Sequence, residues 1–170
     1  MKRLIILTAT TLFAFSFSAT AQSKAKDMMD MPYKATYSSN FKMGNQKYAK
    51  MILDLWKDWD DNAFNRHDYF SDTITAYFPD GSMVKGKSAF MENSKKYRDG
   101  FTAVKSIVHA WVPLWSEDQK MDVVCVWGQE DDTTADGKST KSNLHEVWFF
   151  NKDGKISAFR QWMAKVGEGN

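Results

Sequence analysis

The last third of the chain constrains the fold most, because four long segments rich in β-branched and aromatic residues follow one another there. Such segments are typical of strands. They are separated by short polar breaks that contain Asp136-Gly137 and Asp153-Gly154, both common in tight turns. Short connections join antiparallel neighbours. We therefore expect an antiparallel meander formed by residues 101–115, 120–129, 141–150 and 155–164.

Helical patterns come before this meander. Apolar residues recur at helical spacing from Tyr48 to Ala63, which predicts a long amphipathic helix. A short helical turn is expected at 66–70 and a third helix at 88–99, with a strand over 73–78 between them. Helices that precede strands favour an α+β fold, in which the helices cover one face of the sheet.

The first 21 of the 170 residues have the pattern of a removable signal peptide. Lys2 and Arg3 form a basic start, an uncharged apolar run follows, and Ala19-Thr20-Ala21 has the small residues of a cleavage site. An uncleaved signal anchor is the alternative, but a spanning helix needs about 20 mainly apolar residues, and this run is rich in Ser, Thr and Ala. We expect an exported protein, periplasmic or secreted, that begins at Gln22 and is not stably inserted in a membrane.

Charge and cysteine content exclude several classes of protein. Removal of the signal peptide takes away two basic residues and no acidic ones, which leaves equal numbers of each. No overall field then attracts nucleic acid. The lone Cys125 excludes an internal disulfide. Residues 22–44 show no clear period and are expected to form a linker or extended arm, so the folded domain is expected to span 45–166.

Several segments of this domain resemble the SnoaL-like branch of the nuclear transport factor 2 fold. The resemblance rests on the segments Leu55-Trp56-Lys57-Asp58-Trp59, 69–81, Gly86-Lys87-Ser88-Ala89-Phe90 and 147–156. It implies a cone-shaped domain in which three N-terminal helices pack on a strongly curved antiparallel sheet and enclose a deep, mostly apolar pocket. The same fold serves isomerases, cyclases, dehydratases and non-catalytic proteins, so the function has to be argued from the site.

Glu146 is the most informative candidate residue. It lies between Leu144 and Trp148 on one face of its predicted strand. If the helices cover that face, burial raises the pKa of Glu146, which makes it a general acid or base. The resemblance places it where steroid isomerases of this fold carry a carboxylic acid that the apolar site keeps protonated. Alternatively, Glu146 faces solvent or pairs with Arg160.

Other candidate catalytic groups are less clearly indicated. The steroid isomerases carry an Asp immediately before the proline that ends the first strand, and this chain has Phe78 there, so that base is missing. Tyr77 is a candidate hydrogen-bond donor and His109 a candidate base, although both residue types commonly pack in a core at such positions. His145 is next to Glu146 on the strand, so only one of the two can face the pocket.

The chain has seven tryptophans, most of which are expected to lie in the core. We expect Trp56, Trp59, Trp148 and Gln161 to contact a ligand. Trp162 is predicted on the opposite face of the sheet, where an exposed apolar patch would favour a homodimer.

Metal and cofactor motifs are not found in the sequence. The histidines lack ligand spacing, the acidic run at 58–62 lacks the glycine of a calcium loop, and no glycine-rich phosphate loop is present. We therefore expect no metal and no cofactor. The run Glu130-Asp131-Asp132 is interpreted as a solvated part of a hairpin loop.

Two functions remain open from the sequence. The first is an exported protein that binds a small apolar molecule and supports cofactor-free proton transfer of the isomerase, dehydratase or cyclase type. The second is a non-catalytic module of the same fold that binds a ligand or a partner. Whether the chain is an enzyme therefore stays open.

Overall fold

The computed structural model describes residues 31–167. The predicted signal peptide and its cleavage site lie outside these residues. Residues 31–34 are exposed and form no helix or strand, and residues 35–167 belong to one compact unit. The expected linker at 22–44 is described only from Met31 onward, and its last residues form the short strand β1.

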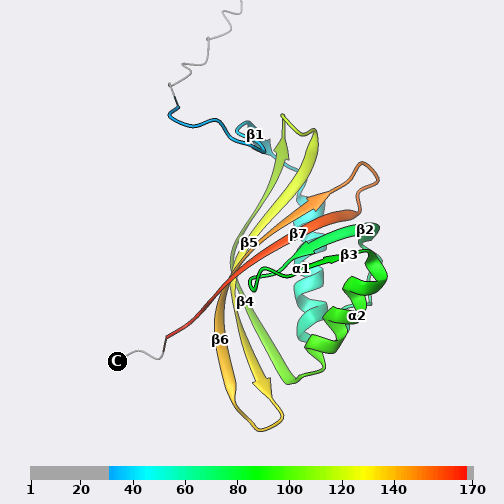
Figure 1. Cartoon of the computed structure of the whole chain (residues 1–170), viewed down its shortest axis with the longest axis vertical. Coiled ribbons are helices and arrows are strands. Elements are labelled where there is room, and N and C mark those ends of the chain that lie inside the picture. The colour runs from blue at the N-terminus through cyan, green and yellow to red at the C-terminus, as the bar shows by residue number, and fades with distance from the viewer. Residues whose placement is uncertain (1–30, 168–170) are drawn as a thin grey trace, which may run out of the picture. The chain divides into compact units, whose positions relative to one another are not determined.

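The compact unit contains one seven-stranded sheet and two helices (Figure 1). The sheet order is β1-β4-β5-β6-β7-β2-β3. Both helices lie on the same side of the sheet, in the hollow formed by its curved long strands (Figure 1). In chain order the elements are β1 (Phe41–Met43), α1 (Gln46–Asp60), β2 (Phe70–Tyr77), β3 (Met83–Lys85), α2 (Lys87–Arg98), β4 (Phe101–Ser116), β5 (Met121–Thr134), β6 (Ser139–Phe150) and β7 (Ile156–Lys165).

The α+β fold and the antiparallel meander are confirmed. Strands β4, β5, β6 and β7 pair antiparallel in sequence order. Register shifts mark irregular positions in β4, between Val108 and Ala110, and in β7, where Ser157 is the extra residue opposite Phe149 and Phe150. Such irregularities bend strands and help the sheet to curve around the helices.

The expectation of a wholly antiparallel sheet is wrong, because β2 pairs in parallel with β7. Tyr77, for example, lies opposite Arg160 in this register. A hairpin forces its two strands to run in opposite directions, but β2 and β7 are joined only through α2 and four further strands. The long connection leaves either direction possible, and the sequence pattern of neighbouring segments does not reveal it.

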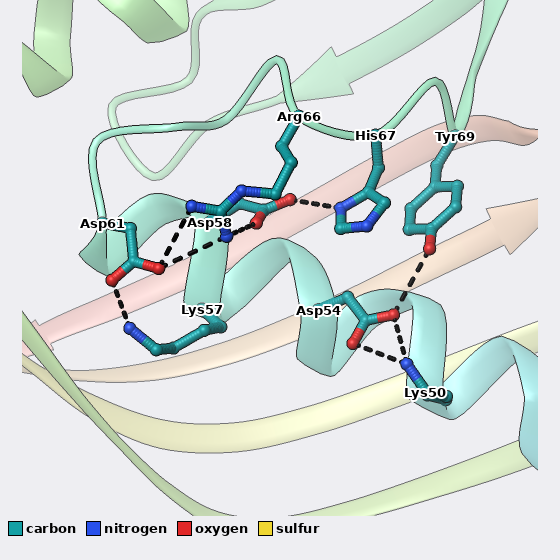
Figure 2. Close-up of polar contacts among 8 residues, drawn as sticks. All are labelled: Lys50, Asp54, Lys57, Asp58, Asp61, Arg66, His67 and Tyr69. Atoms are coloured by element: carbon teal, nitrogen blue, oxygen red, sulfur yellow. Dashed lines mark hydrogen bonds and ion pairs between the residues drawn. The ribbon is translucent and has the colours of Figure 1, made fainter.

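The expectation of three helices is also wrong, because the described residues contain two. The segment predicted as a helical turn at 66–70 runs in turns into β2. Figure 2 shows the contacts that hold it. The buried carboxylate of Asp58 on α1 accepts from Arg66 Nη1 at 2.6 Å and contacts His67 Nδ1 at 2.5 Å. So short a segment is a poor helix nucleus by itself, and these side-chain contacts favour the turn.

The core lies between α1 and the inner face of the sheet. Helix α1 begins at Asn45, whose side chain accepts from the Lys47 backbone N–H at 2.9 Å and so satisfies one free donor of the first turn. Its apolar stripe is buried against the long strands. The main buried residues of this core are Ile52, Leu55, Trp56, Phe70, Ile74, Phe90, Val124, Val126, Trp148, Phe150 and Ile156.

Candidate functional site

A cavity of about 500 Å³ lies between the two helices and the inner face of the sheet. Helix α1 and helix α2 supply one wall, strands β5, β6 and β7 supply the other, and the β2–β3 turn contributes Pro79, Asp80 and Ser82. Eight of the lining residues are aromatic. These are Trp56, Trp59, Phe64, Phe78, Phe90, Tyr97, Trp148 and Phe159.

Strand alternation explains which residues of β6 face this cavity. Leu144, Glu146 and Trp148 are buried on the inner face and line the cavity. The intervening His145 lies on the outer face, stacked between Trp127 and Trp162 with ring centroids 4.9 and 5.3 Å away. Glu146, and not His145, therefore reaches the cavity.

Glu146 is held by three N–H donors from three elements. Its Oε2 accepts from Trp56 Nε1 of α1 at 2.7 Å and from Trp148 Nε1 of β6 at 3.0 Å. Its Oε1 accepts from Gln161 Nε2 of β7 at 2.9 Å. The residue is only 5% exposed. Arg160, the alternative partner, instead lies over the Tyr77 ring with its guanidinium carbon 4.2 Å from the ring centroid.

These contacts influence the protonation of Glu146 in opposite directions. Burial disfavours the charged form and raises the pKa of Glu146, while the N–H groups of Gln161, Trp56 and Trp148 favour the carboxylate and lower it. Burial is the larger effect. Oε2 accepts from two indoles, whereas Oε1 accepts only from Gln161. Oε1 therefore has a lone pair left to carry or release a proton.

A glycine on the neighbouring strand makes room for the Trp56 indole. A methyl group added to Gly128 would lie 2.6 Å from Trp56 Cη2 and 2.6 Å from the Ile107 carbonyl oxygen. Atoms do not approach so closely without displacement. Gly128 therefore leaves room for the indole in the position from which its N–H reaches Glu146.

A second acidic pair lies further along β5, and the sequence analysis missed it. The run Glu130-Asp131-Asp132 belongs to the strand and not to a solvated loop. Asp132 is buried, and Glu130 is part of the cavity wall. Burial, with the Asp132 carboxyl next, raises the pKa of Glu130 to about 9, so Glu130 holds the proton that the pair shares at neutral pH.

Strand alternation is the signal that would have found this pair. Val126, Gly128, Glu130 and Asp132 are spaced two apart, and Val126 lies directly opposite Glu146. The same face therefore carries all of them. The sequence prediction ended this strand at Gln129, which removed the two acids from the face.

The other predicted site residues divide into two groups. Trp56, Trp59, Trp148 and Gln161 line the cavity together with Glu146. His109 and Tyr77 are not among its lining residues.

The structure gives a physical reason for each of these two placements. His109 is exposed at the irregular position of β4, where the alternation of the strand is broken. Tyr77 lies between the inward residues Ala76 and Phe78 and contacts Arg160 instead. Neither can act on a molecule in the cavity.

Residues 31–167 contain no group of metal ligands and no helix that could span a membrane. No three His, Cys, Asp or Glu side chains in this range are grouped so that they would hold a metal ion. Neither helix in this range has the length and apolar character needed to span a membrane.

Comparisons with known proteins agree on the fold. No protein-family model and no curated protein matches the chain. An NTF2-like protein of unknown function from Exiguobacterium sp. 255-15 has 21% identity and a TM-score of 0.56, covering 70% of this chain and 99% of that one.

Two further similar structures have names that refer to enzymes. A putative SnoaL-like polyketide cyclase from Jannaschia sp. CCS1 has 10% identity and a TM-score of 0.57 over 77% of this chain and 90% of that one. The epoxide hydrolase/cyclase-like enzyme SalBIII, of pyran ring formation in salinomycin, has 16% identity and a TM-score of 0.54 over 70% and 92%. At these identities the likeness concerns the fold alone, and it shows that this chain has the NTF2-like fold with SnoaL-like neighbours.

Proposed function

We propose that this chain binds a small, largely apolar molecule in the cavity and transfers a proton to or from it through Glu146, without a cofactor. The observation that carries the proposal is the position of Glu146. A buried carboxyl group lies in an aromatic cavity, held by three N–H donors and with one oxygen free to exchange a proton. The cavity volume is in the range of small-molecule sites.

The geometry suits a reversible proton donor. When Glu146 gives up its Oε1 proton, the carboxylate that remains is stabilised by hydrogen bonds already in place from Trp56, Trp148 and Gln161. The same bonds fix the orientation of the carboxyl group, and the aromatic wall keeps water away from it. The names of two structural neighbours, a polyketide cyclase and an epoxide hydrolase/cyclase-like enzyme, are consistent with chemistry of the isomerase, dehydratase or cyclase type.

A non-catalytic binding module is the second candidate function. It is favoured by the location of His109 and Tyr77 outside the cavity, since Glu146 then lacks the second acid–base group that the sequence suggested. The other titratable residues in the cavity wall are Asp80, Tyr97 and Glu130. The two functions differ in whether the cavity accelerates a proton transfer.

Binding is tested with phenylnaphthylamine, a neutral apolar dye that fluoresces when it leaves water. The wild-type protein is expected to bind one dye molecule. Ser94→Phe, which fills the cavity from α2, is expected to weaken binding at least about tenfold, since it removes the space the dye needs. Lys96→Phe adds the same ring at an exposed position of α2 as a control. Equal dye binding by both variants would contradict the assignment of the site.

Proton transfer is tested with β-tetralone, an apolar ketone, in deuterium oxide. The wild-type protein is expected to accelerate exchange of the ketone's acidic C–H protons, and Glu146→Gln to lose roughly 10²-fold or more of that rate, a typical contribution of general acid–base catalysis. Glu92→Gln, at an exposed position of α2, is the control. Dye binding without any accelerated exchange would favour the non-catalytic module.

We also propose that the chain is exported and forms a homodimer through the outer face of its sheet. Trp127, His145 and Trp162 form a stacked row across β5, β6 and β7, and both tryptophans are exposed, at 39% and 50%. Monomers rarely expose large apolar patches. Light scattering at micromolar concentration should give the mass of a dimer for wild type and of a monomer for Trp162→Glu, whereas Met83→Glu, on β3, should remain a dimer.

A further inference from the structure

The charges that the described side chains of the cavity wall can take on are of one sign. Its ionisable carboxyl groups are Asp80 at the β2–β3 turn, Glu130 on β5 and Glu146 on β6. None of the described residues that line it is Lys, Arg or His. Carboxyl groups buried without a cation lower the stability of the fold, because neither water nor an opposite charge stabilises their ionised form.

A buried cation on α2, Arg98, binds backbone carbonyl groups and does not line the cavity. Arg98 on α2 is only 4% exposed, and its guanidinium donates to the backbone carbonyls of Trp59, Asp60 and Phe101 at 2.7, 3.0 and 3.0 Å. Its charge favours the ionised form of Asp132, but Arg98 is not part of the cavity wall. The carboxyl groups of the cavity wall therefore have no cationic partner among the described residues that line the cavity.

Aromatic rings lie between the acids. The Trp56 indole covers Gly128, which lies two residues from Val126, the partner of Glu146, and two residues from Glu130 on the same strand face. Burial, with the nearby Asp132 and Glu130 carboxyls next, raises the pKa of Tyr97 on α2. Indole and phenol faces attract cations, and carboxylates do so more strongly.

We infer that this cavity selects an organic cation, a protonated amine carried on an aromatic or aliphatic body. The inference rests on the proposed small-molecule function and specifies the class of ligand. The ammonium group would lie between Glu130 and Glu146 against the Trp56 ring, while the apolar body would fill the aromatic part of the cavity near α2. The exposed Asp80 at the β2–β3 turn adds a negative charge to the same wall.

Binding of such a cation must release a proton from the protein at neutral pH. Glu130 is protonated there, with Asp132, Glu146 and Asp60 as the acids that influence it and with Tyr97 and Arg98 of α2 beside Asp132. An ammonium group stabilises the ionised form of Glu130, so the proton passes to solvent. The amine keeps its own proton, and the balance is one proton released for each amine bound.

The experiment compares three ligands that share one aromatic body. These are naphthylmethylamine, which is cationic, naphthalenemethanol, which is neutral, and naphthoate, which is anionic. Calorimetry is expected to give an amine affinity at least about tenfold above that of the alcohol, with naphthoate the weakest. Repeating the titration in phosphate and in Tris, whose ionisation enthalpies differ, is expected to show release of about one proton for the amine and none for the alcohol.

The variant Glu130→Gln tests whether Glu130 causes the amine preference and the proton release. Glu130→Gln is expected to reduce the preference for amine over alcohol at least about fivefold and to abolish proton release, while alcohol binding stays within about twofold. Glu92→Gln, the same substitution at an exposed position of α2, is expected to change neither. The proton count on the wild-type protein does not depend on any variant being folded.

The outcomes separate the two proposals. If the alcohol binds as tightly as the amine, or the amine binds with no proton release, the inference about cations is overturned and the proposed small-molecule site stands. If none of the three ligands binds, both are overturned. If the amine preference survives unchanged in a folded Glu130→Gln variant, the role assigned to Glu130 is wrong.

Discussion

At the scale of single residues, the site depends on Gly128, which has no side chain. The indole of Trp56 reaches Glu146 because Gly128 has no Cβ in its way, and the same indole is part of the cavity wall. One glycine thus determines both the hydrogen bonding of the buried acid and the shape of the space beside it. Glycine in a strand often marks such a close approach.

Gly128→Ala is expected to lower the free energy of unfolding by about 1–3 kcal/mol, the usual cost of overpacking a core. The added methyl group must displace the Trp56 ring or the β4 backbone. Chemical denaturation measures the change, and tryptophan fluorescence should shift as the indole leaves Glu146. Gly167→Ala, where an added methyl group meets open space, is the control. Unchanged stability in Gly128→Ala would contradict the placement of Trp56.

The Glu146 position could be predicted from the sequence because strand alternation fixes faces over short distances. Leu144, Glu146 and Trp148 alternate with their neighbours and so share one face of the strand. The sequence left open only whether the helices cover that face. The Glu130–Asp132 pair could not be predicted in the same way, because charged residues at the end of an apolar run resemble the start of a loop. They stay in β5 because β4 and β6 continue to pair with them, which is a contact between distant segments.

At the scale of elements, a buried acid ties α1 to the segment that enters β2. Asp58 has a side chain only 1% exposed, yet both its partners, Arg66 and His67, are partly exposed. Tyr69, next along the chain, stacks on His67 with ring centroids 4.7 Å apart (Figure 2). The contacts replace the predicted helical turn and lead the chain into β2, whose inner face packs in the core.

Asp58→Asn is expected to destabilise the protein by about 2 kcal/mol, because hydrogen bonds to charged groups contribute roughly 1.5–3 kcal/mol each. The neighbouring acid supplies a matched control. Asp61 also contacts Arg66 but is far more exposed, so Asp61→Asn is expected to cost about 0–1 kcal/mol, as surface ion pairs do. Thermal or urea unfolding compares the two. Similar losses of stability in both variants would show that the burial of Asp58 does not strengthen the contribution of its contacts.

The meander was predicted correctly and the number of helices was not, because the segments that form them differ in length. Strands β4 to β7 are long, alternate clearly and are joined by turns, so their existence follows from local sequence. The segment around Arg66 is short, and its structure depends on Asp58 of α1. The parallel pairing of β2 with β7 is likewise a long-range contact that no local pattern specifies.

At the scale of the whole molecule, buried acids connect stability to pH. The pKa of Glu130 is raised from its ordinary 4.5 to about 9, and that of Glu146 is raised as well. Each group contributes stability that is fully present below its unfolded pKa and is lost as pH rises through its folded pKa. The depressed pKa of acids such as Asp68, at about 2, acts in the opposite direction and only in acid.

The melting temperature is therefore expected to fall as pH rises from about 5 to about 9, with Glu130 as the main cause. Glu130→Gln removes the titrating group and should flatten this decline, while Glu92→Gln should leave the wild-type curve intact. Differential scanning calorimetry across this pH range makes the comparison. Parallel curves for wild type and Glu130→Gln would mean that Glu130 is not a buried, protonated acid.

The parallel pairing of β2 with β7 also determines when the domain can finish folding. Strand β2 pairs with β7, which follows all the other described helices and strands in the chain. Until it emerges, β2 has a free edge, and the apolar faces of β2 and α2 lack part of their support. Such distant pairing slows folding and delays it past synthesis of most of the chain. In the exported protein that we propose, this delay would keep the domain open until β7 has followed the preceding described strands across the membrane.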